Sequence, residues 1–346
     1  MSEMPSRFNT HVVRPLTNIL LANTQDPGVY INNRIFPSID VEYQSDLYYT
    51  MPSDAWFRTV AQERGPATES VGVTYDLNPN NRYDCRVYAV HYDLSDQARR
   101  NYSTPFDAET AATKIVASNI LLRQELDFQR TYLRKNVWGG FVGSGNIPKD
   151  FDCTDSTVSH GQWDLASSDP IMDIEYLMTF MMSQTGRKAN KLTLGKDVFS
   201  APKNHPQFVD RIKYSQLGVT TEALMAQIFG VDELIIAEAV LNSAQEGQQK
   251  RMGFMASNCF LLTYSPSAPT LMEPAAGLRF NWTGYDRAAK LNASVSSIPI
   301  PLRKATRIEA EICYDMRITC TDCGIFGINV LSKAGSTAPA QVPAAA

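Results

Sequence analysis

Residues 109–135 read ETAATKIVASNILLRQELDFQRTYLRK and contain neither glycine nor proline, the residues that interrupt helices. Five apolar side chains recur at intervals of seven and four positions, so a helix places them on one stripe: Ile115, Leu122, Leu126, Leu133 and Val137. Over about 30 residues at about 1.5 Å each, such a helix spans roughly 45 Å. It is therefore longer than a compact domain built from half of this chain. The pattern predicts a long helix lying across the back of a sheet.

The ends of this helix, and a second helix downstream, carry recognisable signals. Asp107 is expected to cap the long helix, and Gly139 follows its end. Further on, the stretch SSDPIMDIEYLMTFMMSQTG predicts a helix over 170–185, with Asp169 as its cap and Gly186 after its last turn. Its apolar face contains four residues: Ile171, Ile174, Met178 and Met181.

The remaining pattern mixes short helices with strands. Helices are expected after Pro206 and over 220–230. Strand composition marks nine segments: 41–51, 70–77, 82–94, 191–195, 233–242, 258–265, 277–284, 307–320 and 323–331. No internal repeat is visible. The sequence therefore predicts an α+β protein with an antiparallel sheet.

In the segment 82–94, neither alternating face is cleanly apolar. Tyr83 and Cys85 share one face with Val87, while Asp84 and Arg86 point the other way. This pattern favours a long hairpin that projects from the body and needs a partner, because an isolated ribbon is marginal in water. A small sheet packed within its own domain fits the pattern equally well.

Composition limits the function classes. With 346 residues and 44% apolar content, the chain can bury a large core, and its formal net charge is −4. This charge argues against sequence-independent DNA binding, which usually requires a basic face. The first residues, MSEMPSRFNTHVVRP, lack the features of a signal peptide, and no apolar run approaches the ~18 residues of a membrane span. The chain is therefore expected to fold in a cytoplasm, without a membrane.

Signatures of catalysis, cofactors and metals are incomplete. Cys320 and Cys323 have the spacing of half a zinc site, but no second pair follows, and the four histidines are scattered. The glycine-rich run 139–145 follows a helix and lacks the lysine and the offsets of a phosphate loop. A Ser-His-Asp site built around His160 or His205 has no support in the sequence. We expect no catalytic, cofactor-binding or metal-binding residues.

Charge is distributed unevenly in the second half of the chain. Residues 187–213 hold seven basic and two acidic side chains, whereas residues 214–246 hold five acids and no lysine or arginine. This division predicts a basic edge and an acidic edge that meet head to tail between copies, as in a ring. The candidate contacts are Arg187, Lys188, Lys191, Glu222, Asp232 and Glu233. Two solvated faces that merely differ in sign are the alternative.

A series of motifs places the chain near a known family. Gly186–Gly195 reads GRKANKLTLG, Asn204–Tyr214 reads NHPQFVDRIKY, and Phe229–Asp232 reads FGVD. In order and spacing, residues 40–331 resemble the major capsid proteins of tailed bacteriophages. The series is specific, although no single motif in it would be.

The resemblance implies the Hong Kong 97-like fold and a division of the chain. An N-terminal arm would occupy 1–40, and an extended hairpin, the E-loop, would occupy 41–100. A peripheral domain with the long spine helix would comprise 101–189 and 295–331. An axial domain would occupy 190–294, and a flexible tail 332–346. A wide, thin shell subunit would explain why the helix is longer than the diameter of a compact domain.

The resemblance also implies a function. Copies would form hexameric and pentameric capsomers of the icosahedral head of a virion, enclosing double-stranded DNA without sequence-specific binding. Assembly would take place in the host cytoplasm with a portal protein, a separate scaffolding protein and possible decoration proteins. Two alternatives remain open: a cytoplasmic α+β enzyme with a non-local active site, and a related phage-derived compartment shell.

Overall fold

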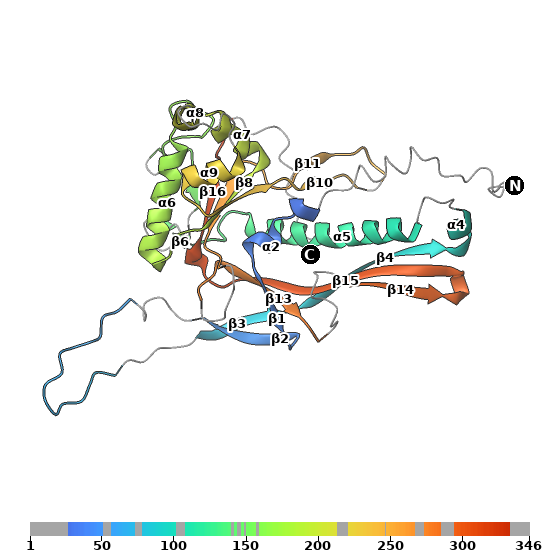
Figure 1. Cartoon of the computed structure of the whole chain (residues 1–346), viewed down its shortest axis with the longest axis horizontal. Coiled ribbons are helices and arrows are strands. Elements are labelled where there is room, and N and C mark those ends of the chain that lie inside the picture. Colours follow the sequence, from blue (N-terminus) through green and yellow to red (C-terminus); the bar gives the residue numbers. More distant parts are fainter. Residues whose placement is uncertain are drawn as a thin grey trace.

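Two β-sheets are stacked on either side of the long helix α5 in the computed structural model (Figure 1). The structure describes residues 27–50, 57–72, 78–101, 108–139, 142–143, 147–148, 150–156, 159–212, 221–245, 247–266, 273–284 and 294–332. Most of the expected arm, most of the expected tail, and Asp107 lie outside these residues. The expected α+β class is confirmed.

The first sheet has the strand order β7-β16-β12-β8-β9. Its strands are Phe151–Asp152, Gly324–Ile328, Cys259–Thr263, Lys191–Gly195 and Glu233–Ala237, in the same order. β12 runs antiparallel to both of its neighbours, whereas β8 with β9 and β16 with β7 are parallel pairs. This sheet is therefore mixed, with antiparallel pairing only at its centre. The expected antiparallel sheet is found in the second sheet, where three strands are antiparallel to one long strand. Four strands of the first sheet are buried at nearly every position, as expected of a sheet covered on both faces.

Four helices cover one face of this sheet: α6 (Pro170–Thr185), α7 (Lys196–Asn204), α8 (Pro206–Ile212) and α9 (Glu222–Phe229). The predicted signals of α6 are confirmed, because Asp169 accepts from Met172 N and Gly186 ends the helix with a left-handed φ of 66°. Thr221 and Gly230 bound α9 in the same way. The sequence interpretation missed α7.

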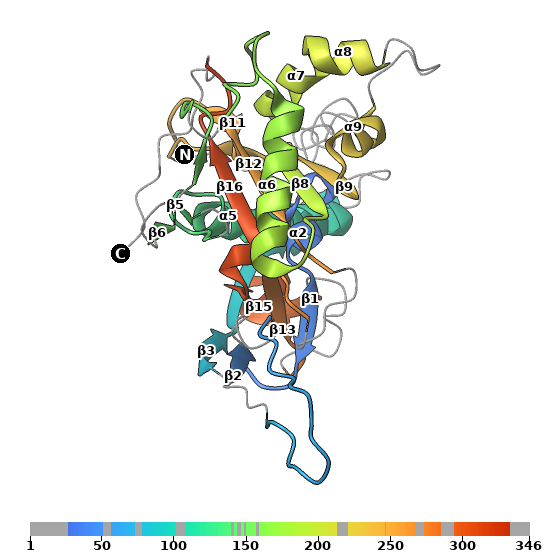
Figure 2. The same ribbon diagram turned by 90° about the vertical axis from the view of Figure 1, so that its left-hand side faces the viewer.

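The second sheet is built around the long strand β15 (Ala305–Ile318). Its strands are β1 (Ser38–Val41), β13 (Gly277–Trp282), β14 (Ser294–Ile300) and β4 (Arg86–Ser95). β14 and β13 pair with successive parts of one side of β15, and β4 pairs with the other side. β1 is parallel to β13. Figure 1 shows this sheet extending well beyond the first one, and Figure 2 shows it below the first sheet.

The long helix α5 (Ala108–Tyr132) packs between the sheets. At about 1.5 Å per residue its 25 residues span roughly 37 Å. The predicted stripe was wrong, because all five of its residues are only partly buried. The buried face instead holds Ala108, Ala112, Val116, Ile120, Gln124, Glu125, Phe128, Gln129 and Tyr132. Three polar residues lie on this buried face because the short helix α2 (Asn32–Ile35) packs against it and forms hydrogen bonds with Glu125.

A two-stranded ribbon leaves the body below the second sheet. β2 (Ser45–Thr50) pairs with β3 (Asn78–Asp84), and β3 is followed directly by β4. The predicted strand 82–94 is therefore broken at Cys85, which is fully buried and donates its N–H to Gln44 O. In the segment 57–72 between the ribbon strands, every residue except Val60 is exposed and none is helical or extended.

The remaining elements are short. They are η1 (Pro27–Val29), α4 (Asp96–Asn101), β5 (Val142–Gly143), β6 (Ile147–Pro148), β10 (Val240–Asn242), β11 (Met252–Phe254), η3 (Pro301–Arg303) and η4 (Thr321–Cys323). The sequence interpretation had joined β9 and β10 into one strand and had missed β1, β11 and β14.

The packing crosses the expected domain limits at four elements. α6 and β16, expected in the peripheral domain, share one core with β8 and β12. β13, expected in the axial domain, pairs with β15 of the other sheet. The expected hairpin range 41–100 contains the ribbon, but also β4, which belongs to the second sheet.

Candidate functional site

Lys191 and Glu233, predicted to lie on opposite charged edges, are neighbours in one chain. They begin the parallel strands β8 and β9 in direct register, with Lys191 Nζ 3.6 Å from Glu233 Oε2. Arg34 of α2 completes a triad, with its Nη2 2.8 Å from Glu233 Oε1. Burial lowers the pKa of Lys191, and the carboxylate of Glu233 opposes this effect. The triad is satisfied within the subunit and fixes α2 to the first sheet.

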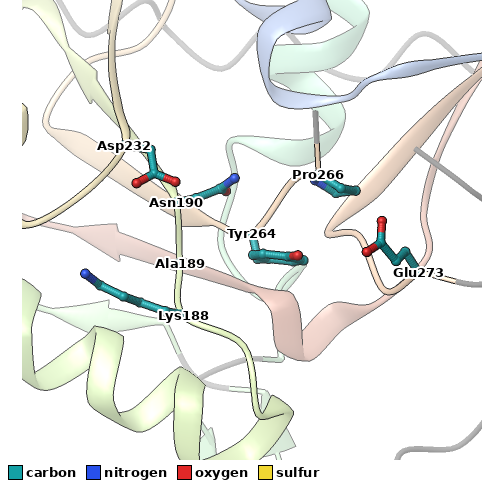
Figure 3. A pocket seen from close by; sticks show the side chains of 7 residues that line it. All are labelled: Lys188, Ala189, Asn190, Asp232, Tyr264, Pro266 and Glu273. Carbon is teal, nitrogen blue, oxygen red and sulfur yellow. The ribbon is translucent and has the colours of Figure 1, made fainter. Parts of the chain in front are cut away.

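Lys188 and Asp232 lie nearby, in a pocket of about 360 Å³ (Figure 3). The other lining residues are Ala189, Asn190, Tyr264, Pro266 and Glu273. The main chain of the pocket is rigid, because Asn190 O accepts from Asp232 N and Glu233 N, and Asn190 Nδ2 donates to Ser265 O. One cation and two carboxylates therefore line a fixed, open, polar depression.

Arg187 and Glu222 complete the predicted set. The guanidinium of Arg187 lies 5.7 Å from the centre of the Tyr264 ring, in a cation–π contact. Glu222 is exposed in the first turn of α9, where a carboxylate favours the helix dipole. The structure thus gathers Arg187, Lys188, Lys191, Asp232 and Glu233 in one region and leaves Glu222 outside the pocket lining. Basic and acidic side chains alternate there, so these residues do not form two separate edges.

Two of the described histidines, His160 and His205, have structural roles. Asp173 is fully buried and accepts from His160 N, His160 Nδ1, Ser159 Oγ and Trp163 Nε1. His205 Nε2 lies 3.1 Å from Leu165 O and 3.4 Å from Ser168 Oγ. Both His205 and Ser168 are almost completely buried, so the serine is not accessible as a nucleophile. These contacts fix the loop before α6.

The cysteine pair does not extend to a metal site in the described residues. Cys320 and Cys323 flank η4, with their sulfur atoms 3.0 Å apart. No group of three or more His, Cys, Asp or Glu side chains that could hold an ion occurs across the described ranges.

Among the helices that the structure describes, none is both long enough and apolar enough to cross a membrane.

Two exposed apolar surfaces escaped the sequence interpretation. On β2, Leu47 (48% exposed) and Tyr49 (56%) face solvent, while Tyr48 between them packs on Phe280. On α6, Met172 (47%) and Tyr176 (44%) lie one turn apart on the outer face. The sequence contains a signal for the surface on β2, because Leu47 and Tyr49 alternate with Tyr48 along a strand and so share one face.

The ribbon itself is attached through its inner face. Tyr83 of β3 stacks on Phe280 of β13, with the ring centres 4.6 Å apart and the planes 9° from parallel. Asp84 N donates to Asp315 on β15. The ribbon therefore packs one face against its own sheet. Its other face is mixed, with Leu47 and Tyr49 exposed beside the charged Arg82, and no described residue covers it. Such a surface is typical of a protein that binds another protein.

Known proteins are similar to this chain in sequence and in fold. No protein-family model matches the chain. The major capsid protein of Burkholderia phage BcepMu is 26% identical over 227 residues, which cover 65% of this chain and 68% of that protein. A phage-related protein of Bordetella bronchiseptica RB50 shares the fold with a TM-score of 0.64 at 16% identity, over 93% of this chain and 98% of the other.

Two assembled shells share the fold as well. The capsid of cyanophage P-SCSP1u matches with a TM-score of 0.52 at 8% identity, over 95% of this chain and 99% of its own. The encapsulin of Synechococcus elongatus PCC 7942 matches with a TM-score of 0.51 at 12% identity, over 93% and 98%. The fold alone is common to virions and compartments, whereas the sequence match is to a phage protein. The chain therefore shares the Hong Kong 97-like fold of phage capsids, and its sequence is similar to that of a phage major capsid protein.

Proposed function

We propose that copies of this chain form hexamers and pentamers that close an icosahedral head around the double-stranded DNA of a tailed phage. The observation that carries this proposal is the ribbon β2–β3, whose connecting segment 57–72 projects beyond the body (Figure 1). Its outer face exposes Leu47 and Tyr49. A neighbouring copy lying against this face would bury that apolar area and stabilise an otherwise marginal ribbon.

The proposed division of labour follows the two sheets. The ribbon would act as the E-loop, and the sheet of β15 with α5 as the peripheral domain. The sheet of β8 and β12 with α6 to α9 would act as the axial domain around the capsomer centre. The residues before β1 would serve as the arm. The charged pocket with Lys188 and Asp232 would then lie on the domain that faces neighbouring copies in a ring.

The charge of the chain fits a container. A formal net charge of −4 gives little attraction to phosphate, so a shell of this protein would enclose DNA without holding it tightly. Many weak contacts between copies would still give a stable closed shell, because each bound neighbour raises the effective concentration of the next.

Further partners follow from this role. A portal protein and a scaffolding protein would act during assembly in the host cytoplasm, and a decoration protein would bind the finished shell. None of these partners is needed for the first test, which uses the purified chain.

The test is electron microscopy of the purified protein after size-exclusion chromatography. Closed particles with five-fold and six-fold capsomers would support the proposal, whereas a monomer that does not assemble under any ionic condition would contradict it. Double-stranded DNA in particles isolated from the native source would distinguish a virion from a protein-loaded compartment. A monomer that converts a small molecule would favour the enzyme alternative.

A further inference from the structure

We propose that Glu125 is a proton-controlled latch that holds α2 against the long helix α5. This device is independent of the proposed assembly, because it operates within one subunit. α2 lies against α5 just before β1 and contacts both sheets (Figure 1). The latch therefore acts at the junction of the three main parts of the molecule.

The carboxylate of Glu125 provides nearly all of the polar contact between the two helices. One oxygen, Oε2, accepts from Ile31 N (3.0 Å), Asn32 N (3.1 Å) and Asn32 Nδ2 (2.9 Å). The other oxygen, Oε1, accepts from Gln129 Nε2 at 2.7 Å. Ile31 N and Asn32 N stand at the start of α2 and would otherwise be unpaired donors in a buried place. Glu125 thus caps α2 from a distance of 93 residues in the sequence.

All four of these donors are neutral. Glu125 is fully buried, and no ion pair to it is formed within the described residues. Arg34, the charged residue of α2, points to Glu233 instead. Arg123 and Asp127, on the same helix as Glu125, pair with each other. The titratable neighbour is the Tyr30 phenol, whose pKa is raised by burial and further by Glu125.

A buried carboxylate without a cation favours its proton. Burial raises the pKa of Glu125, and the hydrogen bonds from Gln129, Asn32 and Ile31 offset only part of this effect. When α2 leaves, water reaches the carboxylate and its pKa returns towards the ordinary value. A pKa that is higher in the docked state means that docking is strongest at low pH and weakens as pH rises through the docked pKa.

The surroundings can accept that proton without losing α2. A proton on Oε1 leaves Oε2 free to accept from the three donors of α2. Gln129 Oε1 is buried and has no hydrogen-bond partner in the described structure, so a turn of this amide would let it accept from the protonated Oε1. The turn would move Gln129 Nε2 to the place where Oε1 had no partner, so the neutral form leaves one buried amide atom unpaired, as the charged form does.

Hydrogen–deuterium exchange of the peptide covering 30–36 in the full, unassembled chain tests the latch. After correction for intrinsic rates, we expect protection to fall on the order of tenfold between acidic and neutral pH in the unmodified protein. Glu125→Gln, which imitates the protonated form, should keep high protection at neutral pH and remove the pH dependence. Glu125→Ala should lower protection at every pH, because the α2 donors lose their acceptor.

Asp127→Asn is the matched control, since it neutralises a carboxylate on the same helix that accepts from Arg123 and Tyr314 and does not touch α2. It should leave the pH profile of 30–36 unchanged. The proposal fails if Glu125→Gln retains the unmodified pH profile, or if Asp127→Asn abolishes it. These two variants decide the question even if Glu125→Ala does not fold.

Discussion

At the scale of single residues, buried polar side chains organise the loops around the helices. Asp173 on α6 satisfies donors from Ser159, His160 and Trp163, and Glu125 on α5 does the same for α2. Both carboxylates lie on the buried faces of their helices, where a pattern of apolar spacing gives no reason to expect them. This is why the predicted stripe of α5 was displaced from the true one.

Replacing Asp173 with alanine should lower the free energy of unfolding by about 3 kcal/mol, because several buried donors lose their acceptor together. Asp169→Ala, at the exposed cap of the same helix, should cost only about 1 kcal/mol. Urea denaturation of the unassembled subunit measures both. Equal losses in the two variants would contradict a special role for Asp173.

The thiols should differ widely in reactivity. Burial raises the pKa of Cys85 and of Cys259 to about 12, which lowers their thiolate fraction on the order of a thousandfold. The thiol of Cys323 donates to Cys320 and thereby lowers the pKa of the partly exposed Cys320. Brief alkylation at pH 7.5, followed by peptide mass spectrometry, should therefore modify Cys320 first. Denatured protein provides the control, in which all six cysteines should react.

At the scale of elements, local signals predicted the helices with good caps and missed those without. Asp169, Pro170 and Gly186 defined α6, and Thr221 with Gly230 defined α9. α7 begins after Gly195, without a side-chain cap, and contains Pro202, so no local signal marks its start. β14 has four polar or proline residues among its seven and is held by its pairing with β15, a contact distant from any local pattern.

Glycine in β16 is required by the rings that cross the strand. A methyl group at Gly327 would overlap the ring of Phe260 on β12, and one at Gly324 would overlap the Trp138 indole. Gly327→Ala should therefore cost about 3 kcal/mol or more, or prevent folding. Gly72→Ala, where nothing lies within 4 Å of the added methyl group, is the control. A Gly327→Ala subunit with the unmodified melting temperature would refute this account of the packing.

At the scale of the whole molecule, the sequence predicted the long helix and a projecting hairpin. It did not predict which sheet and which core each element joins. The core around α5 draws on segments from Ile31 to Phe326, and β13 and β15 pair across an excursion to β14. The runs of like charge in the sequence also did not predict which charged side chains lie close together. Lys191 and Glu233 belong to oppositely charged runs, yet parallel pairing of β8 and β9 sets them side by side.

Changes to the outer face of the ribbon should separate assembly from folding. Leu47→Asp with Tyr49→Asp alters only exposed side chains, so the subunit should keep its circular dichroism and melting temperature. If a neighbour covers this face, electron micrographs should show few or no shells. Tyr48→Ala, between them on the inner face, should instead lower the melting temperature, because Tyr48 packs on Phe280. Normal shells from the double variant would contradict the proposed contact.

The two lysines of the charged region should behave differently. Lys188 has no ion-pair partner within the described part of the chain, so Lys188→Glu should impair assembly without unfolding the subunit. Arg187→Glu should act in the same direction. Lys191→Glu places a second carboxylate beside Glu233 and should lower the stability of the subunit itself. Analytical ultracentrifugation and thermal melting of the three variants separate these effects.

The passage from β15 through η4 into β16 is continuous chain, and it joins one sheet directly to the other. A pull applied between the ends of the subunit is therefore carried by covalent bonds at this point, rather than by side-chain contacts alone. Gly139 N donates to Thr321 O beside it, and the Trp138 indole fills the space under Gly324. The two sheets of one subunit are therefore joined by a covalent connection, whereas two copies would be joined only by non-covalent contacts. Under mechanical load, the contacts between copies would separate before the two sheets of a subunit do.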